Sequence, residues 1–124
     1  MSPTRLLAYG AALLLLWLPG ACGSPPAPDP TASAAPGPTV TRTVTITGSR
    51  VEPPPASVDL PVGGRLVLVV TSDHDDSLHA HGFDVSADLR AGVPTTVALS
   101  GTTPGVYEVE SHDPSLTLLT VAVR

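Results

Sequence analysis

Residues 65–71 read RLVLVVT, and this continuous run of aliphatic and β-branched side chains decides the fold. A short apolar run of this kind, bounded by turn residues, is typical of a strand buried within a sheet. It is preceded by Pro-Val-Gly-Gly at 61–64 and followed by the polar stretch SDHDDS at 72–77. Both flanks have the composition of turns. The sequence therefore predicts a central strand at 65–71.

Weaker strand signals surround this run. Residues 40–47 (VTRTVTIT) alternate between apolar and polar side chains, which is typical of a half-buried strand. Further strands are expected at 57–60, 78–85, 94–99, 106–111 and 116–123. No segment has the 3.6-residue pattern of an amphipathic helix. About seven short strands separated by Gly- and Pro-containing turns predict an all-β sandwich over residues 40–124.

Composition limits both the core and the partners of this domain. The chain has 124 residues, and its expected folded part contains only two aromatic residues, Phe83 and Tyr107. The core must therefore be built from valine and leucine. The net charge is −5 and every basic residue is an arginine, so no basic stripe is present. This charge pattern argues against nucleic acid as a partner.

Residues 1–22 have the layout of a secretory signal peptide. Arg5 precedes an apolar run at 6–18, and Pro19-Gly20 ends that run. This is the order of charged, apolar and cleavage regions in such signals. The run is shorter than the about 20 residues that span a bilayer, which disfavours the alternative of a transmembrane anchor. We therefore expect the chain to be exported.

Cys22, the only cysteine, directly follows this leader. The stretch resembles the lipobox of bacterial lipoproteins, which implies that Cys22 is acylated and becomes the new N-terminus. It departs from that pattern because Leu18 stands one place too far upstream and Pro19 occupies its usual position. The small residues Ala21 and Gly23 also suit ordinary signal peptidase, which would give a secreted protein. We expect lipidation at Cys22 and a place on the outer face of the cell membrane, with secretion as the alternative.

The next segment, residues 23–39 (GSPPAPDPTASAAPGPT), is rich in proline and alanine and has no apolar periodicity. Segments of this composition are disordered but extended spacers, at about 3.1 Å per residue. We expect it to link the membrane anchor to the folded domain.

Four histidines, His74, His79, His81 and His112, lie in the expected domain. Imidazole is the commonest metal ligand, and the carboxylates nearby suit the same divalent ions. His79 and His81 are two apart on an expected strand, so both should point to one face, about 6.6 Å apart. The alternative is that these are polar residues at a sheet end and that the acidic loop at 72–77 is a solvated turn.

The order of HAHGF (79–83), AGVPTTVALS (91–100) and TPGVYEVESH (103–112), followed by a Leu/Val strand, resembles the cupredoxin fold. It is most similar to bacterial EfeO-type cupredoxin-like domains, and more distantly to the copper domains of cytochrome oxidase and nitrous oxide reductase. The resemblance covers roughly 51–124 and implies a Greek-key β-sandwich. It also implies that His81 stands at the first copper histidine and that the second ligand cluster falls near Ser111 and His112.

The ligand inventory departs from that family. The thiolate of the family would fall near Ser111, and no cysteine or methionine remains after Cys22. A blue-copper centre needs a cysteine thiolate, and a binuclear copper centre needs two. Long-range electron transfer through copper is therefore not expected.

These observations predict a membrane-tethered, extracytoplasmic domain that binds or handles a divalent metal at a thiolate-free site. Copper is favoured by the Irving–Williams order. We expect His81 and His112 as ligands, with His79 and Glu110 assisting, and a metal-transport or cell-surface protein as partner. The cupredoxin resemblance implies that His81 and His112 lie near one end of the sandwich, where the loops converge.

The alternative is a metal-free accessory or interaction module, which the missing Cys and Met favour. An enzyme is not expected. Ser111 and His112 are neighbours on a strand, so their side chains face opposite ways and cannot form part of a catalytic triad.

Overall fold

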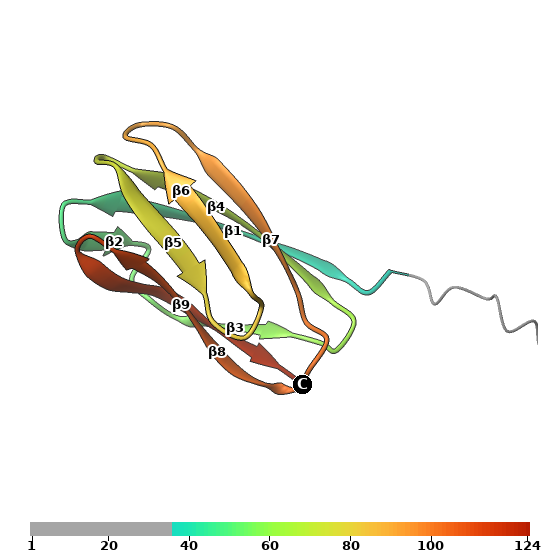
Figure 1. Cartoon of the computed structure of the whole chain (residues 1–124). Coiled ribbons are helices and arrows are strands. Elements are labelled where there is room, and N and C mark those ends of the chain that lie inside the picture. The colour runs from blue at the N-terminus through green and yellow to red at the C-terminus, as the bar shows by residue number, and fades with distance from the viewer. Residues whose placement is uncertain (1–35) are drawn as a thin grey trace, which may run out of the picture. The chain divides into compact units, whose positions relative to one another are not determined.

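The structure is a computed structural model that describes residues 36–124, in which nine strands form two sheets (Figure 1). One sheet has four strands in the order β2-β1-β4-β7, and the other has five in the order β3-β9-β8-β5-β6. The four-stranded sheet contains β1 (Thr39–Thr47), β2 (Arg50–Glu52), β4 (Arg65–Ser72) and β7 (Thr95–Ser100). The five-stranded sheet contains β3 (Ser57–Leu60), β9 (Ser115–Val123), β8 (Gly105–His112), β5 (Asp76–Ala80) and β6 (Val85–Leu89).

The run at 65–71 is the central strand that the sequence predicts. It forms most of β4, which lies between the parallel strand β1 and the antiparallel strand β7. Alternate side chains on β4, namely Leu66, Leu68 and Val70, are buried between the sheets. The residues between them are partly covered or exposed, as the pleat of a strand requires.

The core is aliphatic, as the composition predicts. Its fully buried large side chains are one isoleucine, several leucines and several valines from both sheets. The two aromatic residues, Phe83 and Tyr107, are only partly buried and pack against this core. Their rings contact each other edge to face, with centroids 5.2 Å apart.

The single strand expected at 78–85 was wrong. β5 ends at Ala80, a turn occupies 81–84, and Val85–Leu89 forms the separate strand β6. The turn is required because Gly82 and Asp84 have φ angles of 73° and 56°, a left-handed conformation that ends a strand. Gly82 also lies directly under the Tyr107 ring, where a Cβ atom would collide. With β2 as well, the described residues contain nine strands rather than about seven.

The expected signal peptide at 1–22, with Cys22, and most of the expected linker at 23–39 lie outside the described residues. The last linker positions contact the domain, because the Pro38 carbonyl accepts a hydrogen bond from Arg65 N at 3.0 Å. Within residues 36–124, no helix is long and apolar enough to cross a membrane.

Candidate metal centre

The pairing of β5 with β8 sets the geometry of the candidate site. In this antiparallel pair His79 lies opposite Glu110, and Leu78 lies opposite Ser111. Leu78 and Ser111 are buried in the core. Because successive side chains of a strand point to opposite faces, His79 and Glu110 lie together on the outer face of the five-stranded sheet.

His81 extends this arrangement beyond the end of β5. Its backbone N–H donates to the Glu108 carbonyl at 2.9 Å, which continues the pairing by one step. Its Nε2 atom lies 2.7 Å from Glu110 Oε1, and its ring centroid is 4.4 Å from that of His79. One ligand atom from each of His79, His81 and Glu110 therefore lies within 4.8 Å of the others.

His112, the last residue of β8, borders this group on the other side. Its Nε2 atom is 3.6 Å from Glu110 Oε1, and its ring centroid is 6.1 Å from that of His79. Its other nitrogen, Nδ1, is hydrogen-bonded to Ser77 Oγ at 3.0 Å. Metal-binding histidines usually make such a bond through the nitrogen that does not coordinate. Ser77 therefore leaves Nε2 as the nitrogen that faces the cluster.

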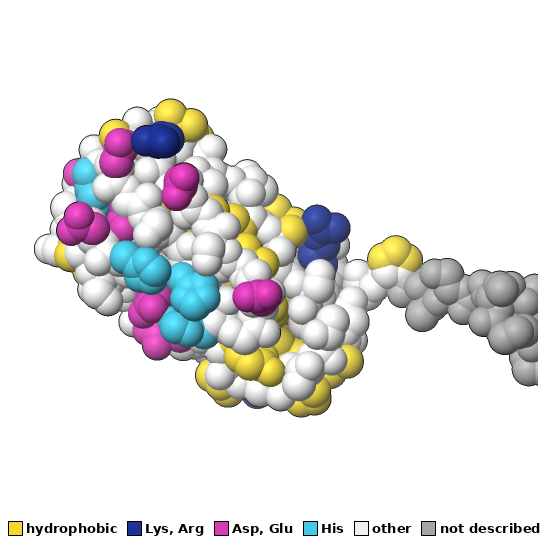
Figure 2. Space-filling model, in the orientation of Figure 1, with side chains coloured by type: hydrophobic (Ala, Val, Ile, Leu, Met, Phe, Trp, Pro, Cys, Tyr) yellow, Lys and Arg dark blue, Asp and Glu magenta, His cyan; other side chains and the backbone are white. Residues whose placement is uncertain are grey.

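The four residues form an open, charged surface cluster. About half of the His81 and His112 side chains is exposed, against 24% for Glu110. Figure 2 shows three histidine side chains side by side on this face with acidic side chains next to them. The hydrogen bond from His81 holds the pKa of Glu110 below its usual range; burial opposes this, and the charges of His81, His112 and His79 add to it. Glu110 is therefore an ionised carboxylate at neutral pH.

The donor set fits a divalent transition metal. Imidazole nitrogens and carboxylate oxygens bind such ions at about 2.0–2.2 Å, which places two ligands of one ion about 3–4 Å apart. The 2.7 Å contact between His81 and Glu110 already has nearly this spacing. His79 offers a third ligand atom within 4.8 Å of those of His81 and Glu110, and His112 Nε2 lies 3.6 Å from Glu110 Oε1. Two or three imidazoles with one carboxylate suit copper(II) or zinc rather than calcium or magnesium.

The four residues that sequence reasoning selected are thus neighbours in the structure, but the position of the cluster differs from the expectation. The sequence placed His81 and His112 at one end of the sandwich, where loops converge. The two residues lie toward opposite ends of the short β5–β8 pair, and the cluster lies across the outer face between them. Sequence reasoning missed Ser77, although it shares the strand parity of His79.

Ser111, where the cupredoxin resemblance would put the thiolate, faces away from this cluster. Ser111 is completely buried, and its Oγ donates to the Pro114 carbonyl at 3.0 Å. Its neighbours on β8, Glu110 and His112, point to the opposite side of the sheet. Ser111 therefore presents its hydroxyl to the interior of the sandwich and not to the histidine cluster.

Two hollows on the described surface lie away from the cluster. The first, of about 200 Å³, is lined by residues of β1, β3 and β9 and by Pro53 and Pro54. The second is lined by residues near Pro55 and by Thr117 and Thr120. Neither is lined by a residue of the histidine cluster, so neither provides a substrate pocket beside it.

Neither a protein-family model nor a curated protein sequence matches the chain. Solved structures do match it. A heme-copper terminal oxidase dimer matches at a TM-score of 0.53 and 18% identity, over 68% of this chain and 64% of that one. A multi-copper oxidase from Pediococcus acidilactici matches at a TM-score of 0.57 and 10% identity, over 69% of this chain and 26% of that one. A copper nitrite reductase from Nitrosomonas europaea matches at a TM-score of 0.52 and 14% identity, over 68% of this chain and 41% of that one.

The chain therefore spans less than two thirds of each of these structures. At such low identity the likeness concerns the arrangement of the strands. That arrangement agrees with the resemblance of the HAHGF and TPGVYEVESH stretches to cupredoxins. The folded part of this chain is a cupredoxin-like β-sandwich.

Proposed function

We propose that this domain binds a divalent metal ion, with copper(II) favoured, through His79, His81, Glu110 and His112. The observation that carries the proposal is the convergence of imidazoles from β5 and its turn on the ionised carboxylate of Glu110. His81 and Glu110 are 29 residues apart in the sequence, and the β5–β8 register brings the two histidines of β5 and its turn to the same face as Glu110. Two histidines that are merely exposed on a surface need no carboxylate between them, so the position of Glu110 favours a ligand set.

Each residue would have a defined part in holding the ion. His81 and His112 would present Nε2, because these nitrogens lie nearest to the Glu110 carboxylate. Glu110 would neutralise one positive charge of the ion, and His79 would complete the set from the opposite strand. Copper(II) is favoured because it is the strongest binder of nitrogen and oxygen ligands in the Irving–Williams order. The oxidase and nitrite reductase named above are also copper proteins by description.

The role that fits this site is metal binding or transfer rather than catalysis. The cluster is half exposed and lies on the outside of a sheet, so a partner protein has direct access to the ion. Ser111 in the interior removes the thiolate on which blue-copper electron transfer depends.

The proposed setting is the outer face of the cell membrane. Export follows from the apolar leader, and a lipid on Cys22 with the linker at 23–39 would tether the domain. Such a tether suits a protein that meets a metal-transport or other cell-surface partner. The resemblance to EfeO-type domains is part of this proposal and rests on the motifs at 79–83 and 103–112.

Titration calorimetry with copper(II) on the wild-type protein and on His81→Ala tests the proposal. The wild type should bind one ion, and His81→Ala should bind at least about tenfold more weakly, because loss even of an outer-shell partner costs about 10–100-fold. Glu52→Gln, an exposed carboxylate on the edge strand β2 of the other sheet, is the control and should bind like the wild type. Equal, weak binding by all three proteins would contradict metal binding.

The second candidate is a metal-free accessory or interaction module with the same fold. The buried Ser111 favours it, because the interior position of the family's thiolate is closed by a hydroxyl bonded to Pro114. Under this alternative the histidine cluster would be an ordinary polar surface, and its substitution would leave copper binding unchanged.

A further inference from the structure

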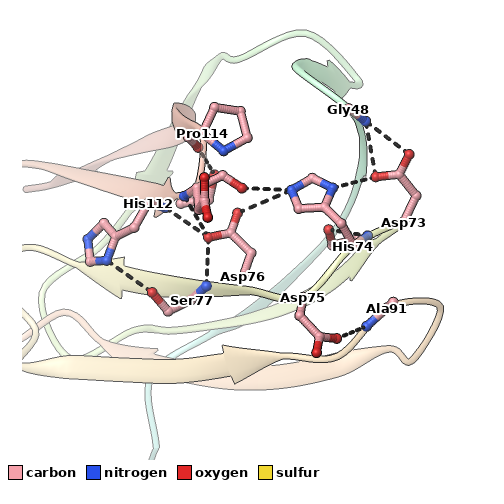
Figure 3. Close-up of polar contacts among 12 residues, drawn as sticks. Gly48, Asp73, His74, Asp75, Asp76, Ser77, Ala91, His112 and Pro114 are labelled. Carbon is pink, nitrogen blue, oxygen red and sulfur yellow. Dashed lines mark hydrogen bonds and ion pairs between the residues drawn. The ribbon is translucent and has the colours of Figure 1, made fainter.

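His74 is the histidine that stands apart from the cluster, and it lies where three chain connections meet. These are the β1–β2 turn, the β4–β5 loop and the β8–β9 turn, which lie at the same end of the sandwich (Figure 1). Figure 3 shows the His74 ring between Asp73 on one side and the β8–β9 turn on the other. Both sheets contribute to this junction, because β1 and β4 belong to one sheet and β5, β8 and β9 to the other.

Both nitrogens of the His74 ring face hydrogen-bond acceptors. Nδ1 is 2.6 Å from Asp73 Oδ1, and Nε2 is 2.8 Å from the Asp113 carbonyl oxygen. A carbonyl never donates a hydrogen bond, and an ionised carboxylate does not either. A neutral imidazole has one N–H and can satisfy only one of these contacts. The imidazolium form has two and satisfies both.

The Asp73 carboxylate continues the connection to the β1–β2 turn. Its two oxygens accept the Gly48 N–H at 3.0 Å each. The hydrogen bond from His74 and that from Gly48 hold the pKa of Asp73 below its ordinary value of 3.8. Asp73 is therefore ionised at neutral pH, and its contact with His74 is an acceptor contact.

A buried carboxylate on β5, that of Asp76, lies beside the His74 ring. The Asp76 side chain is fully buried, and its Oδ1 atom accepts the backbone N–H groups of Ser77, His112 and Asp113. Its Oδ2 atom has no hydrogen-bond partner and lies 3.7 Å from His74 Nε2. Burial acts to raise the pKa of Asp76, but the backbone N–H groups hold it below the ordinary value. An ionised group with one bare oxygen in the interior is costly unless a cation faces it.

His74 is the group that supplies this cation. The arginine ion pairs of the described chain involve Glu52, Asp75 and Asp59 and not Asp73 or Asp76. Asp75, the remaining acid of the loop, faces Arg90 and the Ala91 N–H instead. The same contacts exclude His74 as a metal ligand, since neither ring nitrogen has a free lone pair toward an ion.

We propose that His74 is an imidazolium at neutral pH and acts as a proton-operated clasp that ties the β1–β2 turn, through Asp73 and Gly48, to the β8–β9 turn. Loss of the proton leaves a ring with one N–H, so one of the two ties opens and the charge facing Asp76 disappears. The clasp does not depend on metal binding, because none of its contacts uses a side chain of the histidine cluster.

The direction of the pH effect follows from the contacts. The hydrogen bond to Asp73 raises the pKa of His74 above its ordinary value of 6.5, although burial opposes this. A group with a raised folded-state pKa stabilises the fold fully below its unfolded pKa, and loses that contribution as pH rises through the folded value. The clasp is thus closed below the ordinary histidine pKa of 6.5, and it opens as the pH rises through the higher folded-state pKa of His74. At the acid end, protonation of Asp73, whose folded-state pKa is held below its ordinary value, removes the partner of His74.

Nitrogen-15 NMR of the histidine rings in the metal-free wild-type protein tests the proposal directly. At pH 6.5 both His74 nitrogens should be largely protonated, and the His74 midpoint should lie above 6.5. Asp73→Asn should lower that midpoint, while Asp75→Asn, in the same loop but facing Arg90, should leave it unchanged. A His74 ring with a single protonated nitrogen at pH 6.5 would overturn the proposal.

Chemical denaturation of His74→Gln provides the second measurement. A glutamine amide donates from one end only, so the variant should be less stable than the wild type at pH 5.5, and the difference should shrink above the His74 midpoint. A stability loss that is the same on both sides of the midpoint would mean that the ring acts by packing alone. If His74→Gln does not fold, the NMR titrations of the wild type and of Asp73→Asn still test whether His74 carries two protons and depends on Asp73.

Discussion

The imidazole of His81 bonds diagonally across the β5–β8 pair to Glu110, with 2.7 Å between Nε2 and Oε1, although His79 is the residue directly opposite Glu110. The Glu110 carboxylate therefore lies next to two imidazoles on the same face of the sheet, and His112 Nε2 lies 3.6 Å from it on the other side. Glu110 is the centre of the cluster, and its replacement is the most informative single change.

Glu110→Gln keeps the shape of the side chain and removes its charge. We expect at least about a 100-fold loss in copper(II) affinity, more than the removal of an outer-shell partner usually costs. The reason is that the variant loses a ligand and leaves the imidazoles without a counter-charge. Calorimetry against Glu52→Gln, an exposed carboxylate on β2, separates this from a general effect of net charge. Unchanged affinity in Glu110→Gln would place the ion elsewhere.

The pH dependence of binding should report the imidazoles and not the carboxylate. Each histidine must lose its proton to coordinate, so affinity should fall as the solution is made more acidic. The pKa of Glu110 is held below its usual range by His81, so this group stays ionised throughout that fall. Copper(II) titrations from pH 5 to 8 check the prediction. An affinity that persists down to the range where carboxylates titrate would argue against histidine ligands.

Strand parity explains how much of the site the sequence could predict. The shared face of His79 and His81, and the opposite faces of Ser111 and His112, follow from the two-residue period of a strand. The sequence does not contain the register that places His79 against Glu110, because that register depends on how two distant strands pair. The expectation that the cluster lies at the end of the sandwich came from the cupredoxin resemblance, which implies that position.

The fold was predictable where the apolar pattern is strong and not where a turn interrupts it. The central strand and the aliphatic core follow from the run at 65–71 and from the scarcity of aromatic residues. The turn at 81–84 was missed because HGFDV alternates in hydrophobicity like a strand. Gly82 and Asp84 adopt left-handed backbone conformations there, and the Tyr107 ring, 25 residues from Gly82 in the chain, covers Gly82.

Ser77→Ala tests whether the orientation of His112 matters for the metal. Without the hydroxyl at 3.0 Å from Nδ1, the ring is free to rotate and Nε2 no longer faces Glu110 consistently. We expect about a tenfold loss in affinity, the lower end of the range for outer-shell partners. Ser100→Ala, at an exposed position of β7 in the other sheet, is the matched control. Equal affinities of Ser77→Ala and wild type would exclude His112 as an oriented ligand.

Cys22→Ala tests the proposed anchor. If a lipid on Cys22 holds the protein at the membrane, the variant should appear in the soluble fraction while the wild type sediments with membranes. Mass spectrometry of the wild-type N-terminus provides the independent check, and should find an acylated Cys22. A free wild-type protein that begins at Ser24 would instead support ordinary signal-peptide cleavage.

Ser111→Cys separates the surface cluster from an interior site of the cupredoxin type. A thiol at this position would point into the core, because Ser111 is fully buried and faces away from Glu110 and His112. The variant should therefore bind copper(II) with the wild-type affinity and without the intense blue colour that a copper–thiolate bond produces. Visible absorption spectra of the copper-loaded wild type and variant make the comparison, with thiol titration to verify that the new cysteine is reduced. A strong new absorption band in the variant would mean that the ion binds between the sheets, and would assign the outer histidines a different role.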